Sequence, residues 1–319
     1  MSTIVDDTTF AASTEPYRRE LHVHSYRMLG SFEEAEDAVQ ETFLRAWRRR
    51  ETFDGSAAYR AWLYRIATNV CLDLMRRNNR RPRSRSLESL GEVPWLQPYP
   101  DHLLDEIAPR EDEPDAIAVQ RETIELAFLA AIQHLPPRQR AVLILRDVLG
   151  SSANDTASVL DASVVSVNSA LQRARATLRD RLPERRTEWA PSSSPSEDER
   201  ELLRRYVDAH ERADVDALAA LLREDARLSM PPHATWFDGR EAILIASQQG
   251  FEPEFGHVRS VATGANLQPA VAHYLREPGA SEHRPLAIDV LRIEGGLVAE
   301  ITSFVSPELF GAFGLPPVL

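Results

Sequence analysis

The stretch from residue 135 to residue 182 constrains the fold most, because three amphipathic helical patterns follow one another there. Apolar residues recur at helical intervals over 141–149, 153–160 and 164–178. The segment 161–163 is short enough for an abrupt turn, and Ser163 is placed to cap the helix that follows. The pattern predicts a helix-turn-helix, a motif that places its last helix in the major groove of duplex DNA.

The polar face of that last helix predicts contact with DNA. Asn, Gln and Arg side chains make paired hydrogen bonds with base edges, and Ser and Arg side chains bind phosphates. The predicted contacts are Ser166, Asn168, Ser169, Gln172, Arg173 and Arg175. Any solvated helix face can have this composition, so the prediction depends on turn, cap and apolar stripe occurring together.

Basic residues are concentrated in two segments of a chain whose net charge is -12. Residues 17–86 contain 15 Arg against 9 acidic residues, and residues 138–186 contain 9 Arg against 5. The segments 87–137 and 187–319 are acidic, and the chain contains no Lys. Because phosphate binding depends on the local field, the two basic segments are the predicted nucleic-acid surfaces.

The first basic segment contains two more helical patterns. Residues 31–34 read as a capping box that opens an amphipathic helix. A second helix is predicted over about 58–77, where Tyr59 and Trp62 alternate with Arg60 and Arg65. Aromatic and Arg side chains in alternation are typical of proteins that stack unpaired bases. The alternative is that the rings pack against neighbouring helices.

Length and composition exclude several classes of protein. At 319 residues the chain is long enough for two or three domains. Cys71 is the single cysteine, which excludes an intramolecular disulfide and fits a reducing compartment. No apolar run approaches the roughly 20 residues that cross a bilayer, and the N-terminus is acidic where a signal peptide is basic. We therefore expect a soluble, cytoplasmic protein without membrane contact.

Four motifs in this order resemble those of extracytoplasmic-function (ECF) sigma factors of the sigma-70 family. They are YRMLG at 26–30, AEDAVQETFLRAW at 35–47, AWLYRIATN at 61–69 and LPPRQRAVLILRDVLG at 135–150. The resemblance covers about residues 15–186. It implies promoter DNA and the clamp and flap regions of bacterial RNA polymerase core as partners, with no cofactor.

The resemblance also implies roles for individual residues. Contacts with core polymerase fall on Asp37, Gln40, Glu41 and Arg45. Melting and capture of the −10 element fall on Asp54, Ser56, Tyr59, Arg60, Trp62, Arg65, Asn69, Arg76 and Arg77. The helix-turn-helix reads the −35 element as duplex. Many relatives have Lys and Arg in its recognition helix where this chain has Asn168 and Ala170, so fewer DNA contacts are expected there.

The segment 82–115 is rich in Pro and acidic residues, and it predicts a tether between the two basic modules. The acidic residues Glu111, Asp112 and Glu113 suggest that the tether runs through the positively charged channel of RNA polymerase that later holds RNA. Trp95 and Tyr99 in this segment either pack on another domain, such as the C-terminal one, or belong to a disordered tether.

Composition changes after a Pro- and Ser-rich linker at 187–196. Two helical patterns, the second running through Val215, Leu218, Leu221 and Leu222, precede strand patterns at 257–263, 270–275, 285–293 and 297–305. Gly295-Gly296 reads as a hairpin turn. The motifs Asp216-Ala217-Leu218 and EGGLVAEITSF, the latter at 294–304, resemble the SnoaL-like polyketide-cyclase family, which implies an α+β cone.

The expected fold class is multidomain, with two all-α sigma modules followed by an α+β cone-shaped SnoaL-like domain. The expected parts are a disordered N-terminus (1–14), sigma region 2 (15–81), the acidic linker (82–115), sigma region 4 (116–186), a short linker (187–196) and the SnoaL-like regulatory domain (197–319).

An enzymatic C-terminal domain is the competing hypothesis. Cyclase relatives place an acidic residue inside the cone, but this chain reads Thr302-Ser303-Phe304 where that residue is expected. The other polar candidates are His233, His257, His273 and Asp289, which form no metal-binding or nucleophile motif. We therefore expect no catalysis and no metal, and a regulatory domain that senses a small-molecule ligand. The alternative is a ligand-responsive DNA-binding regulator, or a DNA-tethered SnoaL-like enzyme, that acts without polymerase.

Overall fold

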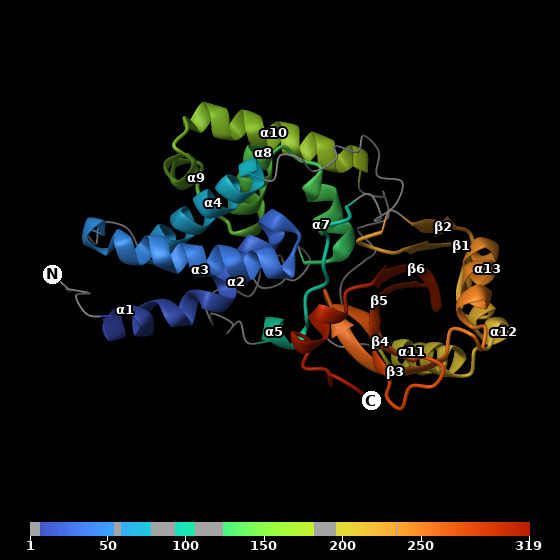
Figure 1. Ribbon diagram of the computed structural model, residues 1–319. Coiled ribbons are helices and arrows are strands. Elements are labelled where there is room, and N and C mark those ends of the chain that lie inside the picture. Colours follow the sequence, from blue (N-terminus) through green and yellow to red (C-terminus); the bar gives the residue numbers. More distant parts are fainter. Residues whose placement is uncertain (1–6, 54–58, 78–92, 106–123, 182–195, 234) are drawn as a thin grey trace. The chain divides into compact units, whose positions relative to one another are not determined.

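Helices form the first part of the chain and one curved sheet dominates the last part in the computed structural model (Figure 1). The structure describes residues 7–53, 59–77, 93–105, 124–181, 196–233 and 235–319. Unit 1 comprises Met1–Arg85 and Asp105–Trp189, and unit 2 comprises Ser86–Leu104 and Ala190–Leu319. Part of the predicted tether therefore belongs to the C-terminal unit.

The first half of unit 1 consists of α1 (Asp7–Thr14), η1 (Glu15–Tyr17), α2 (Arg18–Leu29), α3 (Phe32–Arg48), η2 (Arg50–Thr52) and α4 (Tyr59–Arg77). Gly30 ends α2 in the left-handed conformation with φ 74°, and its N–H donates to the Tyr26 carbonyl at 2.7 Å. Ser31 then caps α3, because its Oγ accepts the N–H of Glu34 at 3.2 Å. The predicted helix start at residue 31 is confirmed.

The prediction of disorder for residues 1–14 was wrong from Asp7 onward, because Asp7–Thr14 form helix α1. Phe10 is buried, and its ring meets that of Trp47 on α3 edge to face, with centroids 5.2 Å apart. A single aromatic residue creates no periodic pattern, and the ring that holds it lies far along the sequence.

A buried hydrogen-bond chain joins α2 to α4. The hydroxyl of Thr68 donates to the Tyr64 carbonyl at 2.7 Å, so its oxygen accepts from Nε2 of His24 at 3.0 Å. Nδ1 of His24 has no hydrogen-bond partner among the described residues. Burial, together with Arg27 and Arg60, lowers the pKa of His24 to about 3. His24 is therefore a neutral donor at neutral pH.

The second half of unit 1 consists of α7 (Leu126–Gln133), α8 (Pro137–Leu143), the π-helical turn η4 (Ile144–Val148), α9 (Ala153–Leu160) and α10 (Val164–Arg181). Asp161 adopts φ 48° between α9 and α10, and Ser163 Oγ accepts the N–H of Ser166 at 3.2 Å. These features confirm the helix-turn-helix. The first predicted helix differs, because it changes from α to π geometry at Ile144.

Arg140 of α8 connects the two halves of unit 1. Its buried guanidinium donates to the carbonyl of Met28 on α2 at 2.5 Å, and to the carbonyl and Oε1 of Gln133, each at 2.6 Å. The Gln133 side chain also lies against Gly30, where a Cβ would come within 2.9 Å of it. The helix-turn-helix half therefore packs on α2 through buried polar contacts.

Unit 2 contains α5 (His102–Asp105) at its edge in sequence, then α11 (Glu197–Glu211), α12 (Val215–Ala219), β1 (Leu222–Ser229), β2 (Trp236–Asp238), α13 (Arg240–Gly250), β3 (His257–Ala265), β4 (Gln268–Arg276), β5 (Arg284–Glu294), β6 (Leu297–Phe304) and η6 (Pro307–Gly311). The strands form one sheet in the order β2-β1-β6-β5-β4-β3. Only β1 and β6 pair in parallel, and the other neighbours are antiparallel.

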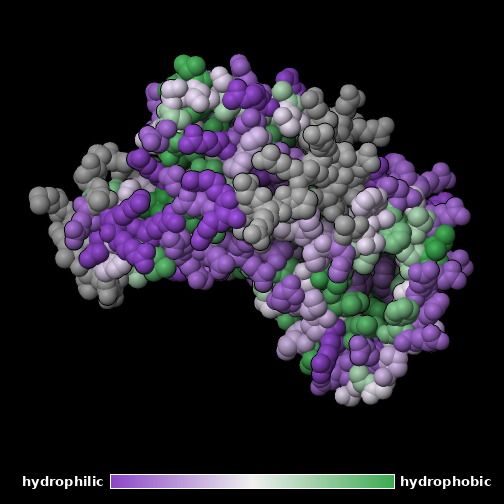
Figure 2. Space-filling view, turned by 45° about the horizontal axis from the view of Figure 1, so that its top comes forward, coloured by the Kyte–Doolittle hydropathy of each residue, from purple (hydrophilic) through white to green (hydrophobic). Residues whose placement is uncertain are grey.

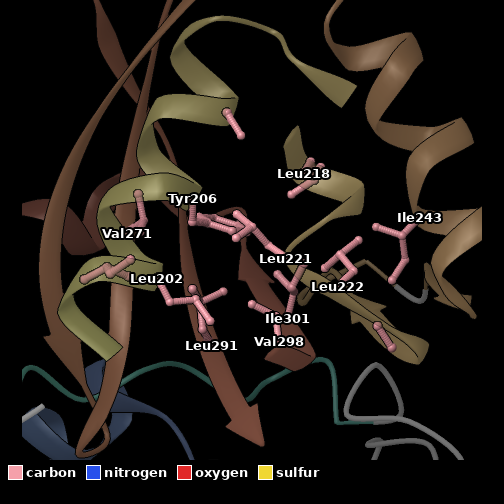
Figure 3. Packing of buried hydrophobic residues seen from close by; sticks show 13 residues of the cluster. Leu202, Tyr206, Leu218, Leu221, Leu222, Ile243, Val271, Leu291, Val298 and Ile301 are labelled. Atoms are coloured by element: carbon pink, nitrogen blue, oxygen red, sulfur yellow. The ribbon is translucent and has the colours of Figure 1, made fainter. Parts of the chain in front are cut away.

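The core of unit 2 lies between its helices and the sheet. Helix α11 packs against β3 and β4, and α13 packs against β1. Figure 3 shows Leu202 and Tyr206 of α11 pointing toward Leu291 of β5 and Ile301 of β6. This arrangement of helices on a curved sheet is the predicted α+β cone.

The four predicted strands after residue 257 are confirmed, as is the turn at Gly295-Gly296. The helix predicted through Leu221 and Leu222 was wrong at its end, because α12 stops at Ala219 and β1 starts at Leu222. The pairing of β1 with β6 shifts register between Leu222 and Arg227, so its buried residues do not alternate. Strand β2 and helix α13 were not predicted. Within the described residues no helix is long and apolar enough to span a membrane.

Candidate nucleic-acid and polymerase interfaces

All four residues predicted to contact polymerase lie on helix α3 and are at least partly exposed. Asp37 and Gln40 are exposed, and Glu41 is partly exposed one turn later. Leu44 follows on the same face and is 51% exposed. Figure 2 shows mostly hydrophilic residues on the visible face of the helical unit, and a large exposed leucine is an exception on such a surface. Sequence reasoning missed Leu44, although an apolar residue within a polar face was the available signal.

The fourth residue, Arg45, is held within unit 1. Its Nε donates to Glu41 at 2.7 Å, and its Nη1 donates to Asp73 of α4 at 2.7 Å. The hydrogen bond to Asp73 is the main cause of a raised pKa for Arg45. Arg45 therefore ties α3 to α4 and positions Glu41.

The start of α4 holds a group of aromatic rings. Phe53, Tyr59 and Trp62 have centroids 5.3 to 5.5 Å apart, and Tyr17 lies 5.8 Å from Tyr59. The rings therefore pack on one another, while Trp62 stays partly exposed. Asp54 and Ser56 lie outside the described residues.

The exposed face of α4 continues from Trp62 to Arg65 and Asn69, at intervals of three and four residues. Asn69 Nδ2 donates to the Arg65 carbonyl at 2.9 Å. Arg76 and Arg77 are exposed near the end of the helix. A strip of one ring, one amide and several guanidinium groups is suited to stacking a base and neutralising its backbone.

Arg60 does not belong to this strip. Its Nε donates to Glu20 of α2 at 2.8 Å, and its guanidinium lies 4.8 Å from the centre of the Tyr64 ring. The predicted DNA contact at Arg60 therefore competes with an internal ion pair and a cation–π contact.

Helix α10 presents the predicted −35 residues on its surface. Ser166, Asn168, Gln172 and Arg173 are exposed, and Ser169 is partly exposed. Arg175 is exposed as well, but its guanidinium makes a two-pronged ion pair with Asp147 at 2.9 and 2.6 Å.

Two residues of α10 change the expectation for this surface. Ala170 is only 8% exposed and faces the core, so the absence of a charge there removes no DNA contact. Val165 is 75% exposed in the first turn, the part of a recognition helix that reaches base edges. An apolar side chain at that place is suited to a thymine methyl group. Sequence reasoning missed Val165, which belongs neither to the predicted apolar stripe nor to the predicted polar face of this helix.

The linker segment 93–104 belongs to unit 2 and contacts the sheet of that unit. The N–H of Tyr99 donates to Asn266 Oδ1 at 2.8 Å, and the N–H of Asn266 donates to the Tyr99 carbonyl at 2.9 Å. Pro100 and Ala265 form an antiparallel bridge, and Asp101 Oδ1 accepts the N–H of Leu267 at 2.8 Å. Tyr99 is fully buried. The alternative that Tyr99 packs on the C-terminal domain is therefore the one observed, and Glu111, Asp112 and Glu113 lie outside the described residues.

A polar cluster is buried in unit 2. Asp289 Oδ2 accepts from the Tyr206 hydroxyl at 2.8 Å and lies 3.0 Å from His273 Nε2. Ser260 Oγ lies 2.9 Å from His273 Nδ1, and the rings of His210 and His273 are 4.7 Å apart. Burial acts to raise the pKa of Asp289, but His273 and then His210 outweigh it and lower that pKa to about 2. Burial, followed by His273, lowers the pKa of His210 to about 4.

The other polar candidates lie elsewhere. His233 and His257 are exposed, and Nδ1 of His257 is 3.1 Å from Nε2 of His283. Thr302 and Ser303 are buried on β6. Sequence reasoning missed Tyr206 and His210 as members of this cluster, because neither forms a motif with His273 or Asp289 in the sequence.

Three protein-family models match the chain. Sigma-70 region 2 matches residues 14–81, Sigma-70 region 4 matches residues 125–178, and the SnoaL-like domain matches residues 203–301. Together with two helical DNA-binding modules, these matches define a transcription initiation factor of the sigma-70 class with a SnoaL-like domain.

Relatives extend this result to most of the chain. The ECF RNA polymerase sigma factor SigG of Mycobacterium tuberculosis (strain H37Rv) is 42% identical over 97% of this chain and 85% of SigG. SigW of Bacillus subtilis is 29% identical over 56% of this chain and 90% of SigW. The protein belongs to the ECF sigma factor family. It binds RNA polymerase core and directs promoter-specific transcription initiation.

A solved structure shows the same fold. The crystal structure of the Mycobacterium tuberculosis ECF sigma factor SigJ aligns with a TM-score of 0.59 at 20% identity, covering 96% of this chain and 99% of SigJ. The expected order of two sigma modules and a SnoaL-like domain is confirmed.

Proposed function

We propose that the C-terminal domain controls initiation by holding the linker that joins the two sigma modules. The observation that carries this proposal is the reciprocal pair of hydrogen bonds between Tyr99 and Asn266, next to the bridge from Pro100 to Ala265. A linker tied to the sheet at these residues limits the positions that the two modules can take. Its release allows them to reach the −10 and −35 elements together.

The exposed face of α3 docks on the clamp region of core polymerase. Asp37, Gln40 and Glu41 supply charged and polar contacts around Leu44, which supplies apolar area at the centre. The helix-turn-helix half contacts the flap region while α10 remains available to DNA.

Promoter recognition is divided between α4 and α10. Trp62 stacks a base of the melted −10 strand, and Arg65 and Asn69 bind its backbone. In the −35 duplex, α10 presents Ser166, Asn168, Ser169, Gln172 and Arg173 to the major groove.

The SnoaL-like domain acts in this scheme as a regulator and not as a catalyst. Its contact with the linker supports regulation, since that contact lies on the only covalent path between the two sigma modules. A small molecule bound inside the domain can control the linker if its affinity differs between the docked and released states.

A reversible disulfide tests the linker proposal. The residues of an antiparallel bridge pair are close enough for a disulfide, so the double variant Pro100→Cys and Ala265→Cys locks the docked linker when oxidised. Cys71 does not compete, because it is buried and burial raises the pKa of its thiol to about 12. Run-off transcription with core polymerase is expected to fall on oxidation and to recover on reduction.

Control variants distinguish locking from damage. Val261→Cys with Ala272→Cys places a disulfide between the paired strands β3 and β4, away from the linker, and is expected to be active in both redox states. Equal initiation by the oxidised and reduced Pro100→Cys, Ala265→Cys protein would contradict the proposal.

A further inference from the structure

Promoter recognition and linker docking use none of the polar cluster inside unit 2. Its members come from three elements: His210 from α11, His273 from β4 and Asp289 from β5. One ligand-type atom from each lies within 4.8 Å of the others. Buried polar groups of this kind need partners, so the cluster requires an explanation.

Each histidine is oriented by a partner at Nδ1. His210 Nδ1 lies 2.9 Å from the carbonyl of Tyr206, and a carbonyl oxygen only accepts, so Nδ1 carries the proton and Nε2 keeps its lone pair. His273 Nδ1 faces the Ser260 hydroxyl at 2.9 Å, which can donate or accept. A second-shell hydrogen bond at one ring nitrogen is the usual support for a histidine that binds metal through the other.

The carboxylate of Asp289 lies at the centre of the cluster. Oδ2 accepts from Tyr206 and faces Nε2 of His273 at 3.0 Å, and the Ser303 side chain on β6 also interacts with the carboxylate. Asp289 and His273 are each 5% exposed, and His210 is more open to solvent. The cluster thus contains a buried carboxylate, and its most solvent-exposed member is His210.

We propose that His210 Nε2, His273 Nε2 and Asp289 bind one divalent transition-metal ion, with a fourth position open to water or a ligand. Two imidazoles and one carboxylate suit Zn²⁺ and its first-row neighbours. Ligand atoms about 2.1 Å from a tetrahedral ion lie about 3.4 Å apart. The widest separation in the cluster, at most 4.8 Å, must therefore shorten by up to about 1.4 Å, whereas the 3.0 Å between His273 Nε2 and Asp289 Oδ2 must lengthen slightly. His273 is then protonated at Nδ1, and this N–H donates a hydrogen bond to Ser260 Oγ.

The ligands are far apart in the sequence, and this explains why no metal was expected there. His210 precedes His273 by 63 residues and Asp289 follows it by 16, with no short ligand spacing. Register in the antiparallel sheet sets the last two side by side, because His273 pairs with Ala287 and Val271 pairs with Asp289.

Metal titration of the full chain tests the proposal with Zn²⁺ and Co²⁺ as probes. Equilibrium dialysis with elemental analysis is expected to give one ion per chain, and bound Co²⁺ is expected to show the intense visible bands of a four-coordinate site. Asp289→Asn and His210→Gln are each expected to weaken binding more than tenfold, and Ser260→Ala by about tenfold through loss of orientation. Circular dichroism of each variant monitors folding.

A second histidine pair provides the matched control. His257→Gln removes the exposed member of the pair that His257 forms with the buried His283, and is expected to leave the single ion bound. No binding by the wild-type chain, or equal binding by folded His210→Gln protein, would overturn the proposal. The result is independent of whether the linker controls initiation, because it is read without polymerase or DNA.

Discussion

Asn266→Gly isolates one hydrogen bond of the linker contact. Asn266 is buried at φ 56°, a conformation that Gly adopts without strain. The substitution removes Oδ1 and leaves the N–H of Tyr99 buried without its acceptor, while the backbone bond from Asn266 N–H to the Tyr99 carbonyl remains. The loss of one partner of a buried pair costs about 1–3 kcal/mol. That cost corresponds to a change of about 5- to 150-fold in the docking equilibrium of the linker.

Hydrogen exchange measures that equilibrium directly. Amides of residues 96–101 are expected to exchange about 5- to 150-fold faster in Asn266→Gly than in the wild type, because exchange requires release of the linker. Amides of β5, away from the contact, are expected to keep their rates. If the docked linker restrains the sigma modules, run-off transcription increases in the same variant.

Ala213→Gly controls for the general effect of a new glycine. Ala213 has φ 53° in the same unit, is exposed, and lies outside the linker contact. Equal exchange at residues 96–101 in Asn266→Gly and Ala213→Gly would refute the reasoning, since the hydrogen bond at Tyr99 would then hold nothing in place.

Other predictions concern unit 1. Leu44→Glu lowers the affinity for core polymerase by tenfold or more (about 1.4 kcal/mol) without lowering the melting temperature. The control variant Leu44→Met retains binding. A lower melting temperature for Leu44→Glu would contradict the prediction, because it would place Leu44 in the hydrophobic core of unit 1. Trp62→Ala weakens binding of a single-stranded −10 oligonucleotide by about 1–3 kcal/mol, and Trp62→Phe restores most of it. Val165→Ala removes the preference for thymine over uracil in the −35 duplex, which a binding assay with both duplexes tests. The native pKa of His24 is about 3 and its unfolded value is 6.5, so its contribution to stability is complete above pH 6.5 and is lost as pH falls. Urea unfolding at pH 7 and pH 5 should show about 2 kcal/mol more loss for the wild type than for His24→Gln; equal losses would show that His24 charges freely in the folded state.

Much of the DNA-binding part was predictable because its signals are local. The cap at Ser163, the turn at Asp161 and the polar face of α10 all lie within a few residues of one another, and the structure agrees with each. Local sequence patterns gave wrong expectations for Ala170 and Arg60. Sequence places both near DNA-facing positions, but the core of the helix-turn-helix buries Ala170, and Glu20 from another helix engages Arg60.

The sequence was sufficient to predict the main helices of the sigma modules, the last four strands, the two basic modules and the family, because helical period, strand alternation and motif order are local features of the chain. Contacts between groups far apart in the sequence became known only from the folded structure. Tyr99 meets Asn266, and His210 meets His273 and Asp289, through sheet register and helix packing that no local pattern encodes. Long-range contacts of this kind depend on how the whole chain buries its apolar surface, so they become visible only in the folded protein.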